Sequence, residues 1–112
     1  MANTPQRIAK LLTTGTDTLY TFPSSGPTRG VLEFLNLCSL VTGDVTVDIW
    51  QLDIDGTTKH YLLKGVTVPG GGVISFTGLV TLDDGSSNQQ KIQATCSAGS
   101  SVDALGTVIE NA

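Results

Sequence analysis

Charged residues are scarce in this sequence. They make up 14% of the 112 residues, and six basic side chains against ten acidic ones give a formal net charge of −4 at pH 7. The basic residues are scattered along the chain: Arg7, Lys10, Arg29, Lys59, Lys64 and Lys91. A nucleic-acid-binding surface needs clustered positive charge to neutralise phosphates, so this composition argues against a nucleic-acid partner.

Long apolar runs are also missing. No stretch approaches the roughly 20 apolar residues that a helix needs to span a bilayer. The N-terminal segment, MANTPQRIAK, lacks the basic-then-apolar order of a signal peptide. We therefore expect no membrane partner, and we expect the protein to be made and kept in the cytosol before any assembly.

Histidine occurs once and aromatic residues are few. His60, the single histidine, lies between Lys59 and Tyr61 in a strand-like segment, with no serine in a nucleophile-elbow context. Three Phe, two Tyr and one Trp leave little material for a cleft in which sugars stack. The sequence therefore predicts no catalytic residues, and a protein that is not an enzyme.

Two segments invite comparison with ion-binding loops. Asp53–Gly56 has the alternating carboxylates that open a calcium loop, but the twelfth position, where a bidentate Glu closes such a loop, is Lys64. The triplet Gly70–Gly72 is not followed by the Lys-Ser/Thr pair of a phosphate-binding loop. We predict ordinary turns at both places, with no metal and no cofactor.

The two cysteines, Cys38 and Cys96, both lie in strand-like segments. They have neither the spacing nor the nearby histidine of a zinc site. In a reducing cytosol we predict free thiols that act as small buried hydrophobic residues, with a disulfide as the alternative.

What the sequence does contain is a strand-turn-strand pattern at its centre, Lys59–Phe76. Apolar and β-branched residues run up to Pro69, the Gly70–Gly72 triplet follows, and Val73 resumes the pattern. Proline has no N–H to donate and glycine permits positive φ, so the chain must stop pairing and reverse here. The reversal is either a hairpin or a crossing between sheets.

Strand-like segments recur at roughly ten-residue spacing with no 3.6-residue period. They are Arg7–Thr13, Thr18–Phe22, Arg29–Leu40, Asp44–Asp53, both halves of Lys59–Phe76, Lys91–Cys96 and Ala104–Glu110. Loops are expected at Ser24–Pro27, Asp55–Gly56 and Asp83–Asn88. We predict an all-β fold, a single-domain antiparallel β-sandwich or jelly roll of about eight strands over residues 7–112, after a short N-terminal arm at residues 1–6. The sequence does not separate jelly-roll from immunoglobulin-like connectivity.

The segment Arg29–Leu40 has apolar residues on both of its alternating faces. A strand with one wet face would alternate, so the pattern predicts a central strand covered on both faces. The surplus apolar surface favours a homo-oligomer, either a trimer or a dimer.

The segment Asp44–Asp53 points Val45, Val47 and Ile49 to one side, which leaves Trp50 and Leu52 on the other. Either the chain's own Ser24–Arg29 loop or N-terminal arm covers these two residues, or a partner does. In the second case Trp50 is the anchor, because buried Trp is among the commonest interface hot spots. The candidate interface residues are Trp50, Leu52, Asn3, Pro5 and Arg7.

Four segments, TLYTFP (Thr18–Pro23), KHYLL (Lys59–Leu63), VTVPGGG (Val66–Gly72) and VDALGTVIE (Val102–Glu110), resemble the small β-sandwich virion proteins of tailed bacteriophages. The resemblance extends from about Leu11 to the end of the sequence. The segment Phe22–Gly26 departs modestly from the family's common TxYTVPAG segment, which lengthens the loop.

The resemblance implies a non-enzymatic structural component of a bacteriophage particle. The first reading is a capsid decoration or cement protein that binds and stabilises the shell of major capsid protein, located at the capsid surface of the virion after assembly in the host cytoplasm. The alternatives are a neck, tail or adhesin component, and a free carbohydrate-binding β-sandwich module. The resemblance transfers no catalytic residues.

Overall fold

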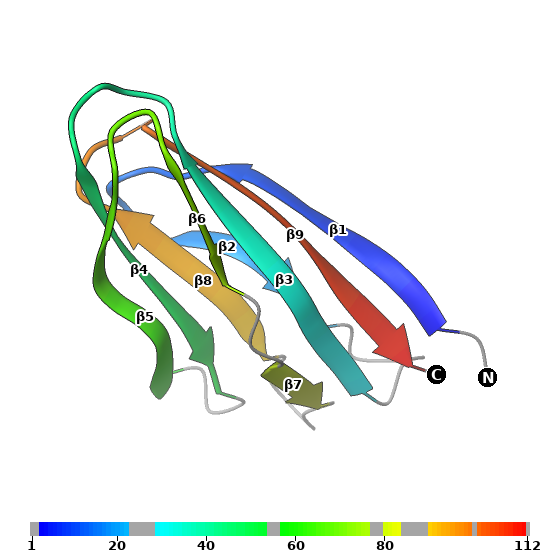
Figure 1. Cartoon of the computed structure of the whole chain (residues 1–112). Coiled ribbons are helices and arrows are strands. Elements are labelled where there is room, and N and C mark those ends of the chain that lie inside the picture. The colour runs from blue at the N-terminus through cyan, green and yellow to red at the C-terminus, as the bar shows by residue number, and fades with distance from the viewer. Residues whose placement is uncertain are drawn as a thin grey trace.

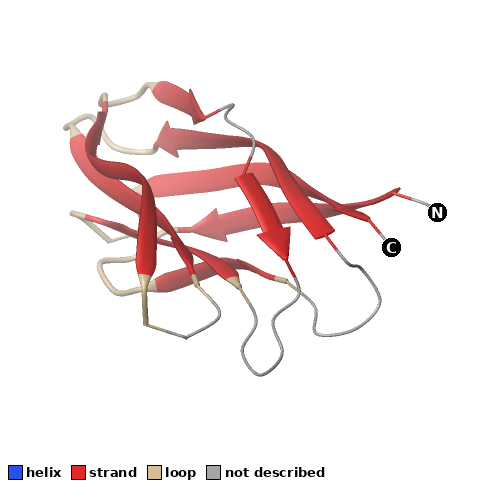
Figure 2. Ribbon diagram, turned by 90° about the horizontal axis from the view of Figure 1, so that it is seen from below, coloured by secondary structure: helices blue, strands red, loops and turns tan. Residues whose placement is uncertain are grey.

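The computed structural model describes residues 3–22, 29–53, 57–76, 80–83, 90–99 and 101–111. All regular structure in these ranges is β-strand (Figure 1; Figure 2). The strands are β1 (Asn3–Leu11), β2 (Asp17–Thr21), β3 (Arg29–Ser39), β4 (Val45–Leu52), β5 (Lys59–Val68), β6 (Val73–Phe76), β7 (Val80–Asp83), β8 (Lys91–Cys96) and β9 (Val102–Asn111). The predicted all-β sandwich is confirmed. None of the described residues belongs to a helix that could cross a membrane.

The strands form two antiparallel sheets. One has the order β1-β9-β3-β6, with β7 also paired to β3, and the other has the order β2-β8-β4-β5. The strand β6 pairs with the second half of β3, and β7 pairs with its first half. These two short strands therefore lie end to end along one edge of β3 and fill a single strand position. The strand β7 is not among the eight segments predicted from the sequence.

The connectivity is that of a jelly roll. The first strand pairs with the last, β2 with β8, β3 with β6 and β7, and β4 with β5. The four pairs are nested: in the sequence, each pair lies between the two strands of the pair before it, as in one long hairpin. Successive pairs belong alternately to the two sheets. A long hairpin rolled up in this way is the jelly-roll arrangement, which the strand pattern alone left open.

The central segment is a crossing between the sheets and not a hairpin. Its first half is β5 in one sheet, and its second half is β6 in the other. At the turn between them, Gly71 has a φ of 68°. A Cβ on Gly70 would lie 1.9 Å from the carbonyl oxygen of Thr42, so no larger residue fits there. Glycine is required at both positions, for different reasons.

The first strand begins earlier than predicted. It runs over Asn3–Leu11 instead of Arg7–Thr13, and residues 3–6 of the expected N-terminal arm pair with the end of β9, Asn3 opposite Asn111. Their polar composition gave no sign of a strand, but they form one because backbone pairing with β9 does not depend on side-chain polarity. Figure 1 accordingly shows the two chain ends side by side. The predicted loops at Ser24–Pro27 and Asp55–Gly56, and residues 84–88 of a third, lie outside the described residues.

The strand β3 is central, as predicted, but its two-sided apolar pattern has another cause. Gly30 and Leu32 face the core before a β-bulge at Leu32–Phe34, and Leu35 and Leu37 face it afterwards. One inserted residue shifts the alternation by one position. Even-numbered residues therefore face the core before the bulge, and odd-numbered residues face it afterwards. Just after the bulge, Leu35 pairs with Gly106, where a Cβ would lie 2.5 Å from the Phe34 carbonyl oxygen.

The core lies between the sheets and is almost entirely aliphatic. The prediction that Val45, Val47 and Ile49 face inward is confirmed, with exposed fractions of 2% or less. They pack with Ile8, Leu12, Phe22, Leu32, Leu35, Leu37, Val68, Ile92, Val102 and Val108. Burying a side chain of this size stabilises the folded state by about 2 kcal/mol, so this cluster is the main source of stability.

Candidate interaction surfaces

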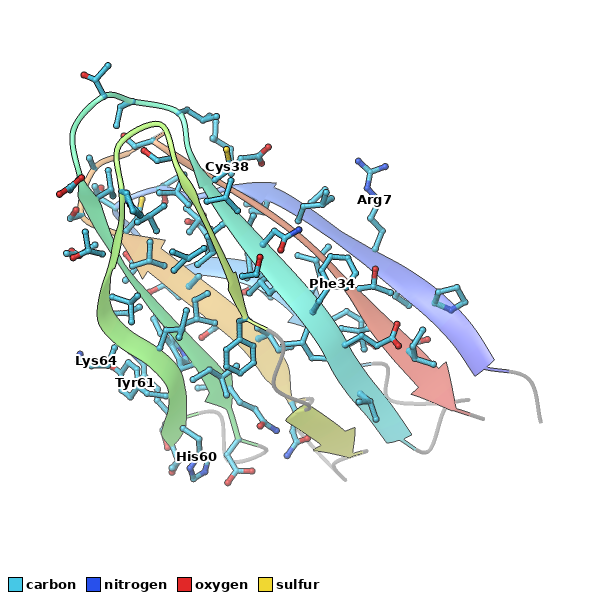
Figure 3. All side chains as sticks on the ribbon, in the orientation of Figure 1. Arg7, Phe34, Cys38, His60, Tyr61 and Lys64 are labelled. Carbon is cyan, nitrogen blue, oxygen red and sulfur yellow. The ribbon has the colours of Figure 1, made fainter. Side chains whose placement is uncertain are left out.

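The outer face of the β1-β9-β3-β6 sheet is the largest candidate surface. The register aligns four rows across the strands: Leu11, Asp103, Cys38 and Val73; Ala9, Leu105, Asn36 and Ser75; Arg7, Thr107 and Phe34; and Pro5, Ile109 and Val31. Most of these residues are apolar. Figure 3 shows Arg7, Phe34 and Cys38 on this side of the sheet. We call these residues the outer β1–β9 face.

Exposed large hydrophobic side chains concentrate at this face. Leu11, Leu105 and Val73 are 43%, 44% and 56% exposed. Two more, Leu40 and Val41, lie in the loop that follows β3 at the same end of the sheet. Among the described residues, Tyr61 is the one large exposed hydrophobic side chain on the other sheet. Apolar surface gathered on one face in this way is typical of a protein-protein contact.

Two charges of opposite sign lie within the outer β1–β9 face. Arg7 is on β1 and Asp103 on β9, both are exposed, and their register positions are two rows apart. Neither belongs to an ion pair among the described residues, where the pairs are His60–Asp53 and Lys64–Asp48. Both charges are therefore free to meet a partner.

Three of the five predicted interface residues come from β1. Pro5 and Arg7 lie on the outer β1–β9 face, opposite Ile109 and Thr107. Asn3 is at the start of the same strand, and its side chain is outside the described part of the structure. None of the five predicted interface residues belongs to the β9 half of this face. Its signal was the segment Ala104–Ile109, where apolar residues occupy both parities around Gly106.

The other two predicted residues, Trp50 and Leu52, lie on the second sheet. Trp50 is 2% exposed although it lies outside the core cluster. Its indole N–H donates to Gln93 Oε1 at 3.0 Å, the Lys59 ammonium lies 4.3 Å from the centre of the ring, and the Tyr61 ring lies 5.8 Å away. Trp50 is thus covered within the chain, by neighbours on β5 and β8. Leu52 is half-buried.

Trp50 lies on β4, and the two neighbouring strands supply these covering groups: Tyr61 and Gln93 are its register partners on either side. The described part of the N-terminal segment belongs to the opposite sheet, so it does not cover Trp50. An interface role for Trp50 and Leu52 stays a prediction.

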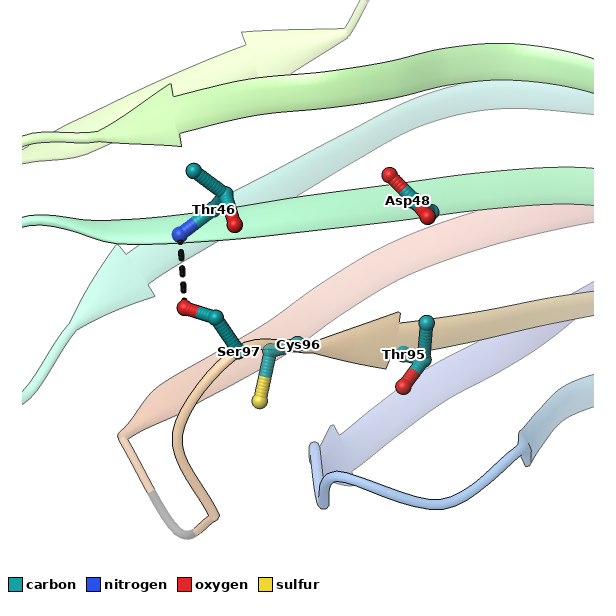
Figure 4. Close-up of a pocket in the computed structure, with 5 residues that line it drawn as sticks. All are labelled: Thr46, Asp48, Thr95, Cys96 and Ser97. Carbon is teal, nitrogen blue, oxygen red and sulfur yellow. Dashed lines mark hydrogen bonds between the residues drawn. The ribbon is translucent and has the colours of Figure 1, made fainter.

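A small hollow opens between β4 and β8 on the same outer side (Figure 4). It is lined by Thr46, Asp48, Thr95, Cys96 and Ser97 and has a volume of about 150 Å³. Ligand sites for small molecules usually exceed roughly 300 Å³. The polar groups are also engaged: Ser97 Oγ accepts from Thr46 N at 3.0 Å, and Asp48 Oδ1 accepts from Gly65 N at 2.6 Å. The hollow is therefore a poor candidate for a ligand site.

Asp48 also lies 3.5 Å from the Lys64 ammonium, and its charge raises the pKa of that lysine. His60 Nε2 is 3.3 Å from Asp53 Oδ2, and both side chains are solvent-accessible. Within the described ranges, no three His, Cys, Asp or Glu side chains gather where a metal ion could be held. The Asp48–Lys64 contact is a surface ion pair and the His60–Asp53 contact is a surface polar contact, and contacts of this kind contribute little to stability.

The cysteines lie on different sheets. Cys38 is on the outer β1–β9 face and half-buried, whereas Cys96 faces the core, and both are free thiols. Burial raises the pKa of the Cys96 thiol, which also lies 2.9 Å from the Ala98 carbonyl oxygen. The prediction of two free thiols holds in this structure, although Cys38 is only partly buried.

A polar contact joins the two sheets inside the sandwich. The Tyr20 hydroxyl of β2 donates to Glu110 Oε2 of β9, and the Gln6 amide of β1 donates to Glu110 Oε1 at 3.3 Å. Burial and the neighbouring Glu110 carboxylate raise the pKa of Tyr20 far above its ordinary value of 10.0. Glu110 is 7% exposed and each of its two carboxylate oxygens accepts a hydrogen bond, so this is a structural contact and offers no open site.

The sequence matches no protein-family model, and no curated protein sequence is significantly similar to it. The fold has solved counterparts. A structure of Bacillus endospore appendages, which form a family of disulfide-linked pili, aligns with a TM-score of 0.55 at 15% identity, over 98% of this chain and 86% of that one.

Two viral structures are similar as well. The acidic stable capsid of Helicobacter pylori bacteriophage KHP30 aligns with a TM-score of 0.60 at 14% identity, over 98% of this chain and 88% of that one. The Gx strain of infectious bursal disease virus gives 0.61 at 15% identity, over 98% of this chain and 32% of the viral chain. At such identities the likeness is one of fold: this chain has a sandwich that capsid and pilus proteins also use.

Proposed function

We propose that this protein is a non-enzymatic structural component of a bacteriophage particle, and specifically a decoration or cement protein that binds the major capsid protein and stabilises the shell. The observation that carries the proposal is the exposed, largely apolar outer β1–β9 face on a jelly roll. A surface of this kind favours burial against protein, from another copy or a neighbour, in a many-copy assembly such as a particle, because leaving it in water is unfavourable.

Three further observations support the proposal. The fold is shared with a phage capsid structure over 98% of this chain. The small polar hollow between β4 and β8 is below the size of ordinary ligand sites. The sequence segments that resemble phage virion proteins form strands β2, β5 and β9 and the β5–β6 crossing, which are framework elements of the sandwich.

The test is the location and copy number of the protein in particles of the phage that encodes it. Immunogold labelling and quantitative mass spectrometry of purified particles are expected to find it on the head, in numbers comparable to those of the major capsid protein. Heads that lack it are expected to break at lower temperature or lower osmotic stress. Labelling confined to the neck or tail would replace the cement role with the alternative structural one, and absence from particles would overturn both.

A carbohydrate-binding module is the second candidate, because Tyr61 is 45% exposed on the outer side of β5. A single tyrosine with the Lys64 ammonium 4.4 Å from its ring centre offers a small stacking platform. Binding to a glycan array that is lost in Tyr61→Ala, together with absence from particles, would favour this function over the structural one.

A further inference from the structure

We propose that the outer β1–β9 face is the surface through which two copies of this chain associate, face to face, about a two-fold axis. The inference deepens the proposed function, because it names the contact by which the protein assembles with itself in the particle.

The two outer faces of the sandwich differ in what they present. The outer β1–β9 face carries Leu11, Leu105 and Val73, all more than two-fifths exposed, whereas the described outer residues of β4 and β8 include Thr46, Asp48, Gln93 and Thr95. The polar face is suited to water. The apolar face has the surface that a second copy would bury.

The positions of the charges favour a second copy over a different protein. Arg7 and Asp103 lie on adjacent strands, four residue pairs apart along the register, which corresponds to roughly 14 Å. Halfway between them lies the pair Ala9 and Leu105. A two-fold axis in the plane of the contact, passing through that pair, places Arg7 of each copy opposite Asp103 of the other.

Both unpaired charges are satisfied at once in this arrangement, and Leu105 of one copy meets Leu105 of the other near the axis. A two-fold contact requires this kind of self-complementarity, in which the same patch serves on both sides. A partner with a surface of a single charge sign would leave either Arg7 or Asp103 opposite a like charge, which is unfavourable. Glu33, the other exposed acidic residue near this face, is at the β3 bulge, away from the axis.

The test measures the mass of the full chain by sedimentation velocity between 1 and 100 µM, on the order of concentrations at which small interfaces assemble. The wild type is expected to form dimers, and Leu105→Lys to be monomeric with unchanged circular dichroism. Tyr61→Lys is the matched control, since Tyr61 is equally exposed on the opposite sheet. This control is expected to remain dimeric.

A charge swap tests the axis. Arg7→Asp and Asp103→Arg should each raise the dimer dissociation constant about tenfold, because each brings like charges together, and the double variant should restore it to within about threefold. Monomeric wild type at the highest concentration, dissociation by Tyr61→Lys but not Leu105→Lys, or no rescue in the double variant would overturn the inference. Finding the protein on heads as isolated monomers would leave the proposed function standing while this inference fails.

Discussion

At the scale of single residues, the buried contact between Tyr20 and Glu110 gives the most specific prediction. Removing the hydroxyl in Tyr20→Phe leaves the buried Glu110 carboxylate with Gln6 as its remaining described donor. We expect a loss of about 2 kcal/mol in the free energy of unfolding at pH 7, measured by urea titration. Glu110→Gln keeps an acceptor for Tyr20 and should cost less, so equal losses in both variants would contradict this explanation.

The raised pKa of Tyr20 also predicts a pH dependence. In the unfolded chain its phenol ionises near the ordinary value of 10.0, whereas in the folded chain it stays protonated. Ionisation then favours the unfolded state, so this contribution to stability is fully present below about pH 10 and is lost as pH rises further. Above that pH, the free energy of unfolding should fall more steeply with pH in the wild type than in Tyr20→Phe. The difference in slope should reach up to about 1.4 kcal/mol per pH unit.

Trp50 lies on the outer face of its sheet, yet its side chain is covered by other residues of the same chain. Its ring is enclosed by Lys59, Tyr61 and Gln93, so Trp50→Ala should lower the free energy of unfolding by about 3 kcal/mol, seen as a lower melting temperature. At a temperature where the variant is folded, its association state should match that of the wild type. An unchanged melting temperature with weakened association would instead make Trp50 an interface anchor.

The two cysteines should differ in reactivity. In the folded monomer, at a concentration too low for association, Cys38 on the outer face should react with iodoacetamide, and buried Cys96 should react slowly because burial raises its pKa and restricts access. After denaturation without reductant, both should be labelled in full, as detected by mass spectrometry. Failure to label either site after denaturation would indicate a disulfide.

At the scale of elements, the crossing from β5 to β6 depends on a close backbone contact. Gly70→Ala would place a Cβ 1.9 Å from the Thr42 carbonyl oxygen and force the β3–β4 loop away. We expect a loss of at least about 2 kcal/mol in the free energy of unfolding. Gly43→Ala is the control, because a Cβ there has no atom within 4 Å. Equal stability of the two variants would refute this role for Gly70.

The strand β3 illustrates what the sequence could and could not predict. Its length and central position follow from its apolar content, but the bulge at Leu32–Phe34 does not, since an inserted residue leaves the composition unchanged. The start of β1 could not be predicted either, because Asn3–Gln6 are mostly polar and pair with β9 through their backbone. Trp50 was placed on the correct face, while its cover by side chains from adjacent strands required knowledge of the strand order.

At the scale of the whole molecule, alternation and turn residues were enough to predict a sandwich of about eight strands. They could not fix the jelly-roll connectivity, because pairing of the first strand with the last depends on contacts across the entire chain. Only part of the outer β1–β9 face could be predicted from the sequence. Pro5 and Arg7 could be proposed, whereas Leu105 and Asp103 lie beside them only because β1 pairs with β9.

The most direct test of the proposed capsid role is a cryo-electron microscopy reconstruction of the particle that is proposed to contain this chain. Density for this jelly roll is expected in many symmetry-related copies on the outside of the shell, with the outer β1–β9 face buried against another copy. A shell whose density is fully explained by other proteins, at a resolution where strands are separated, would contradict it.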